Sequence, residues 1–194
     1  MRLRILLPLA LLQVAVSHAQ TVEEKLQWAR QTIDENAVTH HFEPPGLSSE
    51  TKWAVTRIDG CEIELKETQH RETPNTGYTR DGVFGSSDDK VVTWSFDLAS
   101  LLPGFVTADT SAGLPQIRIF ADGDAFHLKT DFVSRTVGKN GTVTGTRQWS
   151  TPGNARNLWI YFDSPTADNK LLVRRLERDL RSAVSDCTRR KRSR

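Results

Sequence analysis

The chain has 194 residues, of which 37% are hydrophobic and 26% are charged. This composition excludes a disordered chain and suits one globular domain with a sizeable core. The formal net charge is +2, from 26 basic and 24 acidic residues. Five basic residues lie in the last six positions and two more are Arg2 and Arg4, so the rest of the chain carries a net charge of −5. An acidic body of this kind argues against a nucleic-acid-binding protein.

The first nineteen residues have the pattern of a secretory signal peptide. Arg2 and Arg4 precede an almost unbroken apolar run over residues 5–16, and Ser17-His18-Ala19 offers the small residues that a signal peptidase recognises. We therefore expect cleavage at this point and a secreted or periplasmic mature protein that begins at Gln20. The apolar run is shorter than the roughly 20 residues of a membrane-spanning helix, so we expect no membrane span.

Cys61 and Cys187 are the two cysteines of the chain, and they are far apart in the sequence. In an exported protein, two cysteines most often pair with each other, so we expect an internal disulfide. Two free thiols and a bridge between two chains are the alternatives. Cys61 lies in an alternating segment typical of a strand, and Cys187 lies on the apolar stripe of a predicted helix. Both are therefore predicted to be structural rather than catalytic.

The segment after the leader has the features of an amphipathic helix. Thr21 and Glu24 have the spacing of a capping box, in which each side chain bonds the backbone of the other residue. The spacing of the apolar residues predicts a helix from about Val22 to Val38, and Glu43-Pro44-Pro45-Gly46 would end the segment. The apolar positions are Val22, Leu26, Ala29, Ile33 and Ala37.

The middle of the chain has the alternating apolar and polar residues of about seven β-strands. Turn residues separate several of them, at Asp59-Gly60, Ala121–Asp124 and Val137–Thr142. Residues 70–90 are rich in small and polar side chains, which predicts a long exposed loop with a short strand near Tyr78. The predicted strands fall in residues 51–58, 61–66, 92–98, 117–119, 126–132, 143–150 and 158–162.

The last predicted element is a helix that starts at Ser164-Pro165, where Ser caps the helix and Pro suits its first turn. One side of this helix is apolar and the other is charged, which predicts packing of the apolar side on a sheet. Residues 189–194 are predicted to form a flexible basic tail. The apolar positions are Leu172, Val173, Leu176, Leu180, Ala183, Val184 and Cys187.

These elements predict an α+β fold that is mostly β, in a single domain over residues 20–188. About seven antiparallel strands would form a two-sheet sandwich or a partly open barrel, with the C-terminal helix packed on it. The order of strands followed by a closing helix resembles the pleckstrin-homology-like architecture. The N-terminal helix is an addition to that order of elements.

The sequence contains no recognisable catalytic or cofactor-binding motif. It has no Gly-x-Ser-x-Gly elbow, no His-Glu-x-x-His zinc motif and no glycine-rich phosphate loop. His40 and His41 are adjacent, which is not the spacing of a helical chelate. Asp122-Gly123-Asp124 fits a hairpin turn better than a calcium loop, and His127 is expected to face solvent. We therefore expect neither enzymatic activity nor a metal or cofactor.

Two groups of residues are candidate contact sites. Trp149, Trp159 and Tyr161 lie on the last two predicted strands and predict a ligand or partner surface there, whereas Trp53 and Trp94 fall on core-facing positions. The second group is the basic C-terminus, which is suited to an anionic envelope surface. It consists of Arg189, Arg190, Lys191, Arg192 and Arg194.

The first functional hypothesis is an exported, non-enzymatic binding or scaffold protein that associates with an envelope surface or a protein partner. It rests on the leader, the predicted disulfide and the separation of charge between body and tail. The second is a carrier of a small apolar ligand, with a barrel cavity lined by Trp94, Phe96, Phe126, Phe132 and Ile160. A hydrolase with dispersed catalytic groups is the third.

Overall fold

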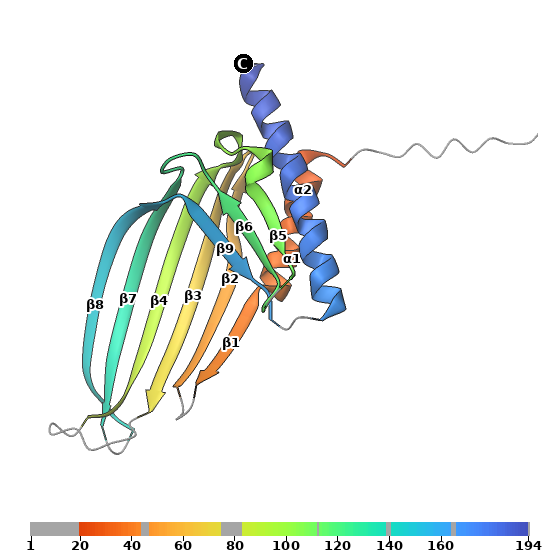
Figure 1. The fold of residues 1–194 in the computed structure, drawn as a ribbon. Coiled ribbons are helices and arrows are strands. Elements are labelled where there is room, and N and C mark those ends of the chain that lie inside the picture. The colour runs from red at the N-terminus through yellow and green to blue at the C-terminus, as the bar shows by residue number, and fades with distance from the viewer. Residues whose placement is uncertain are drawn as a thin grey trace, which may run out of the picture.

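The structure is a computed structural model that describes residues 20–43, 47–74, 83–111, 113–138, 141–163 and 166–193. Its fold is α+β and mostly β, as predicted, with two helices and two antiparallel sheets that do not close into a barrel (Figure 1). Five predicted features fall outside the described residues: the signal peptide, the Pro44-Pro45-Gly46 turn, the strand near Tyr78, the Ser164-Pro165 helix start and Arg194.

The larger sheet has six strands in the order β1-β2-β3-β4-β7-β8, and all neighbouring strands are antiparallel. Every strand except β1 has 13 or 15 residues, whereas strands of about five or six residues are usual. The strands are β1 (Val38–Glu43), β2 (Leu47–Asp59), β3 (Glu62–Pro74), β4 (Val83–Asp97), β7 (Phe126–Gly138) and β8 (Val143–Ala155).

The smaller sheet has three antiparallel strands in the order β5-β6-β9. Helix α1 precedes all the strands, helix α2 follows them, and two short 3₁₀ helices connect β4 to β5. The bounds are β5 (Val106–Asp109), β6 (Gln116–Phe120), β9 (Asn157–Tyr161), α1 (Val22–Asn36), α2 (Ala167–Arg192), and Leu98–Ser100 and Pro103–Phe105 for the 3₁₀ helices.

The core lies at one end of the large sheet, where both helices and the small sheet pack against it, and the other end projects beyond them (Figure 1). Burial of one large apolar side chain stabilises the fold by about 1.5–3 kcal/mol, so this end holds most of the folding energy. Among the largest fully buried side chains are Phe126, Phe162, Leu65, Leu98, Leu101, Ile117, Leu158, Ile160 and Leu176.

Helix α1 begins with the capping box that the sequence predicts. The Thr21 hydroxyl accepts a hydrogen bond from the Glu24 backbone N–H at 3.2 Å, and the Glu24 carboxylate accepts one from the Thr21 N–H at 2.8 Å. The helix ends at Asn36, and β1 follows almost directly, so His40 and His41 lie on a strand. Adjacent residues of a strand point to opposite faces, which separates the two imidazoles.

The long loop predicted over residues 70–90 is wrong. β3 continues to Pro74, β4 begins at Val83, and their residues pair in register. β1 and β5 are also missing from the prediction, so the described residues contain nine strands where about seven are expected. Alternation of apolar and polar residues marks a strand with one buried face, and much of the projecting part of the sheet is in contact with solvent on both faces.

The predicted disulfide is present. Cys61, in the turn before β3, is bonded to Cys187 of α2, with the two Cα atoms 5.9 Å apart. The turn contains Gly60 with a φ of 59°, a conformation that favours glycine. Helix α2 continues to Arg192, so residues 189–192 belong to the helix rather than to a separate flexible tail. Among the described helices, none is long and apolar enough to cross a membrane.

Candidate functional site

A cleft of about 460 Å³ opens between the two sheets. Four aromatic side chains line it, Trp53 and Trp94 from the large sheet and Trp159 and Tyr161 from β9. We call it the aromatic cleft. The other residues that line it are mostly polar: Thr39, Thr51, Glu67, Gln69, Leu114 and Asn157.

The register of the large sheet brings its cleft residues together. Trp53 on β2 is the cross-strand partner of Glu67 on β3, and Trp94 lies on the same face of β4. The ring centroids of Trp53 and Trp94 are 6.1 Å apart. Trp53 is 4% exposed, and its indole N–H has no hydrogen-bond acceptor within the described part of the chain. Because an unpaired buried donor costs about 1–3 kcal/mol, this wall of the cleft is left with an unsatisfied polar group.

Glu67 is the acidic group of the cleft. Burial raises the pKa of its carboxyl, while the charge of Lys90 and a hydrogen bond from Trp94 act in the opposite direction. That bond runs from the Trp94 indole N–H to Oε2 of Glu67 over 3.3 Å. The carboxyl is thus held beside an aromatic ring, where it accepts hydrogen bonds when ionised and donates one when protonated.

The opposite wall is formed by Trp159 and Tyr161, which alternate along β9 with fully buried residues. Trp159 is 42% exposed and meets Tyr161 edge to face, with ring centroids 6.4 Å apart. The guanidinium of Arg118 lies 5.6 Å from the Trp159 ring centroid, and Asp109 binds Arg118 in an ion pair of 2.6 Å. These contacts orient the exposed indole.

The two walls of the cleft influence each other electrostatically. Burial raises the pKa of the Tyr161 hydroxyl, Arg118 lowers it, and the charge of Glu67 on the other wall raises it. The aromatic cleft therefore combines broad apolar faces with a carboxyl, two amides and hydroxyl groups. Pockets with mostly apolar walls and a few fixed polar groups are typical binding sites.

The structure brings together two of the three aromatic residues predicted as a contact surface. Trp159 and Tyr161 line the aromatic cleft. Trp149 lies elsewhere, on β8, where its ring stacks on Phe132 with centroids 4.3 Å apart. The predicted patch is therefore two separate aromatic groups.

Sequence reasoning missed two contributions to the cleft. Trp53 and Trp94 are predicted as core residues, and both do pack on the core, but they also form one wall of the cleft. Glu67 was not singled out at all. A signal for it exists, because Glu67 lies two positions after the buried Leu65 and therefore faces the same side of β3.

The residues expected to line a carrier cavity are distributed differently in the structure. Phe96, Phe126 and Ile160 are packed within the core. The cavity beside Phe96 and Ile160 is about 30 Å³, far below the roughly 300–1,000 Å³ of typical ligand pockets. Trp94 lies in the aromatic cleft, and Phe132 lies on β7 in the stack with Trp149.

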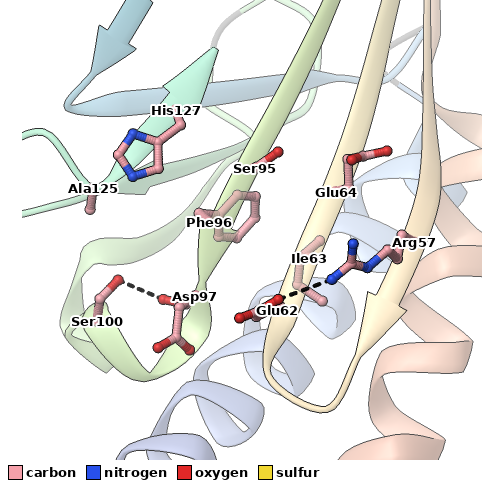
Figure 2. Close-up of a pocket in the computed structure, with 10 residues that line it drawn as sticks. All are labelled: Arg57, Glu62, Ile63, Glu64, Ser95, Phe96, Asp97, Ser100, Ala125 and His127. Atoms are coloured by element: carbon pink, nitrogen blue, oxygen red, sulfur yellow. Dashed lines mark hydrogen bonds and ion pairs between the residues drawn. The ribbon is translucent and has the colours of Figure 1, made fainter. Parts of the chain in front are cut away.

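A second pocket of about 480 Å³ lies where β3 and β4 meet the turns at the core end (Figure 2). Several of its polar groups already bond within the protein: Arg57 donates to the Glu62 carboxylate over 3.1 Å. The Ser100 hydroxyl donates to the Asp97 backbone carbonyl over 2.6 Å. Because these groups are paired and Phe96 is its one large apolar ring, this pocket is a weaker candidate than the aromatic cleft.

His127 faces solvent, as predicted, in a cross-strand row with Ser95 on β4 and Asn154 on β8. Its Nδ1 lies 2.9 Å from Oδ1 of Asn154. A row of hydroxyl, imidazole and amide is typical of a nucleophilic centre only when the hydroxyl bonds the imidazole. Within the described ranges no hydrogen bond joins Ser95 to His127, so the row lacks the contact that activates a nucleophile.

The basic residues at the end of α2 take part in ion pairs. Arg190 donates to both carboxylate oxygens of Glu23, over 2.8 and 3.4 Å, and Lys191 lies 3.3 Å from Oδ2 of Asp97. Arg189 pairs with an aspartate of its own helix. Cations at a helix C-terminus also interact favourably with the helix dipole. Three of the five residues predicted to contact an anionic surface therefore have acidic partners within the protein.

No group of three or more His, Cys, Asp or Glu side chains in the described segments is placed to hold a metal ion. Comparisons with protein-family models, curated proteins and solved structures found no match for this chain. The functional argument therefore rests on the geometry of the aromatic cleft.

Proposed function

We propose that this chain is an exported binding protein that recognises an envelope component through the aromatic cleft. The leader-like residues 1–19 support export, with cleavage near Ala19. The disulfide between Cys61 and Cys187 supports it independently, because such bonds persist in oxidising compartments. The expected location is the periplasm or the extracellular space.

The observation that carries this proposal is the convergence of four aromatic side chains on one open cleft. Trp and Tyr are enriched at binding sites because each combines a large apolar face with a polar tip. If the aromatic side chains of the cleft served folding alone, all of them would be buried. Trp159 is instead 42% exposed, beside polar groups. The cleft, at about 460 Å³, falls within the range of about 300–1,000 Å³ typical of ligand sites.

Binding is also favoured because strands rather than loops position the cleft. Trp53 and Trp94 are anchored at the core end of the large sheet, and the wall opposite them belongs to a strand whose alternate residues are fully buried. A site held in this way loses little conformational freedom when a ligand binds. We propose binding rather than catalysis because Glu67 is the one carboxyl group among the described residues that line the cleft, and no histidine lies beside it there. General acid–base catalysis commonly uses a second such group.

The test is cosedimentation of the mature chain, residues 20–194, with the envelope fraction of the source cells. Trp159→Ala removes an exposed ring from the cleft. Loss of a central aromatic contact costs about 2 kcal/mol, which corresponds to roughly 30-fold weaker binding. The matched control is Phe42→Ala on β1, because Phe42 is 70% exposed and points to the face opposite Thr39, a cleft residue. Equal binding by wild type and Trp159→Ala would overturn the proposal.

A further inference from the structure

The large sheet continues beyond the aromatic cleft as an extended surface. We define its inner face as the face that carries Trp53, Glu67 and Trp94. The strand register places Phe132 of β7 and Trp149 of β8 on this same face, further from the core. The helices pack on β2, β5 and β6 at the core end, and Trp149 is 50% exposed.

The inner face therefore carries two aromatic groups, the cleft and the Phe132–Trp149 stack. Phe132 pairs with Lys90, which lies four residues from Trp94 along β4, a distance of about 13 Å. Phe132 and Trp149 are one and two strands away from β4, so the two groups are about 14–16 Å apart. A ligand that reaches both must be a chain of several units rather than one small molecule.

The surface between the two aromatic groups mixes polar and apolar side chains, because Val92 of β4 and Leu128 of β7 lie on the inner face beside Thr130. Gln69, Thr130 and Thr151 lie on the inner face along this path and offer amide and hydroxyl groups. A lipid acyl chain favours a continuous apolar groove, and here Lys90, Thr130 and Thr151 interrupt the apolar side chains of the path. The polar groups instead match a ligand that is rich in hydroxyls.

The charges of the inner face nearly balance. Arg71, Lys90 and Arg147 are basic, and Glu67 and Asp88 are acidic. A groove for single-stranded nucleic acid has a clear excess of positive charge. The near balance complements an uncharged or weakly acidic chain.

Two hydrogen-bonding groups along this path are left unpaired by folding. The indole N–H of Trp53, which is 4% exposed and lines the cleft, has no acceptor among the described residues. One carboxylate oxygen of Asp88, on the inner face of β4, is also buried without a donor there. Both atoms are almost inaccessible to solvent, so the polar groups that a ligand on this face reaches directly are the side chains of Gln69, Thr130 and Thr151.

We infer that the inner face binds a linear polysaccharide, which runs from the aromatic cleft to the Phe132–Trp149 stack. This inference rests on the proposed binding function and adds the class of ligand. The C–H faces of pyranose rings pack on aromatic rings, and their hydroxyls exchange hydrogen bonds with Glu67, Gln69 and the threonines between the two groups.

The experiment is calorimetric titration of the mature chain with three hexasaccharides, cellohexaose, chitohexaose and hexagalacturonic acid, and with the corresponding monosaccharides. We expect at least one hexasaccharide to bind, with an affinity at least about tenfold above that of its monomer. Trp159→Ala and Trp149→Ala should each weaken that binding about tenfold or more, because each variant removes an aromatic face on which a pyranose ring packs. Phe42→Ala should bind as wild type does.

A stacking-retaining variant separates loss of contact from loss of folding. Trp149→Phe keeps a ring against Phe132 and should retain most of the affinity that Trp149→Ala loses, with unchanged circular dichroism in both. No binding by any hexasaccharide at millimolar concentration would overturn the inference. Tighter binding of palmitate or of oligo(dT) than of every hexasaccharide would do so too. Envelope binding that depends on Trp159 without hexasaccharide binding would leave the proposed function standing and the polysaccharide assignment refuted.

Discussion

Glu67 is the residue at which the requirements of folding and of binding conflict. Burial disfavours its ionised form and raises the pKa of its carboxyl. The folded state therefore holds this proton more tightly than the unfolded chain does. Glu67 therefore stabilises the folded state below the pKa that its carboxyl has in the unfolded chain. This stabilisation is lost as the pH rises through the raised pKa of the folded state. A charged group kept at such a cost is typical of a functional site.

Glu67→Gln removes this cost without changing the shape of the side chain. At neutral pH we expect the melting temperature to rise by about 2–4 °C, the shift that roughly 1 kcal/mol produces in a domain of this size. At acidic pH, where wild-type Glu67 is protonated, the gain should disappear. Thermal melts at both pH values check this, with the exposed Glu62→Gln as the control. A gain of equal size at both pH values would contradict the assigned role of burial.

His70 offers a second test at the scale of single residues. Its Nδ1 lies 2.6 Å from Oδ1 of Asp89, and this hydrogen bond raises the pKa of His70, with a smaller effect from Glu72. NMR titration should show that Asp89→Asn lowers the pKa of His70 more than Glu72→Gln does. The stabilisation from His70 is present below the unfolded pKa of about 6.5 and is lost as the pH rises through the folded pKa. A larger effect of Glu72→Gln would contradict the geometry.

At the scale of elements, Asp34 joins α1 to an irregularity in β2. The register between β2 and β3 shifts between Val55 and Arg57, and the Val55 backbone N–H donates to Oδ1 of Asp34 over 2.6 Å. Asp34→Ala leaves this donor of a buried residue without its acceptor, so urea unfolding should show a loss of about 1–3 kcal/mol. Glu35→Ala, which removes an exposed bond to Gln31, should change stability by less than about 0.5 kcal/mol. Equal losses would argue against the role of Asp34.

The disulfide is the second connection between elements that a variant can test. It links the turn before β3 to α2 and closes a loop with a sequence separation of 126 residues. In the chain-entropy model such a crosslink contributes about 4–5 kcal/mol, so Cys61→Ala with Cys187→Ala should lower the melting temperature by about 8 °C or more. Reduction of the wild type should produce a similar decrease. A decrease of only a degree or two would show that packing alone holds α2 in place.

At the scale of the whole molecule, the protein is divided into a packed end and a solvated end. β8 is an edge strand whose residues are exposed from Val143 to Asn154, whereas β9 and the core end of β3 contain fully buried residues. Hydrogen exchange should therefore be fast in β8 and slow in β9 and around Leu65. Uniformly slow exchange across β8 would show that another molecule, or a second copy of the chain, covers this edge.

The elements that the sequence predicts well are those with one buried face. The capping box at Thr21 and the apolar stripes of both helices depend on residues within one turn of each other, so short-range spacing determines them. Leu158 and Ile160 of β9 alternate with exposed neighbours in the same way. The disulfide is predicted from the leader-like pattern of residues 1–19 and from the count of two cysteines.

The projecting half of the sheet escaped prediction for a physical reason. Residues 70–73 of β3 and 85–90 of β4 have almost no apolar side chains on either side of the sheet, because no layer covers them. Their strand structure comes from hydrogen bonds to neighbouring strands, and those bonds leave no periodic pattern of apolar residues. The ion pairs of Arg190 and Lys191 are missing from the prediction for a related reason, since their partners Glu23 and Asp97 lie far away in the chain.

Four features follow from local patterns in the sequence: the two helices, the crosslink, the mostly β character, and aromatic residues beyond those of the core, such as Trp159 and Tyr161. The packing of the two sheets places Trp159 in one cleft with Trp53, Trp94 and Glu67, and it leaves Trp149 apart, stacked on Phe132. Local spacing specifies which face of an element is apolar. Which distant strands face each other depends on how two sheets pack around one core, and that arrangement is a property of the whole chain.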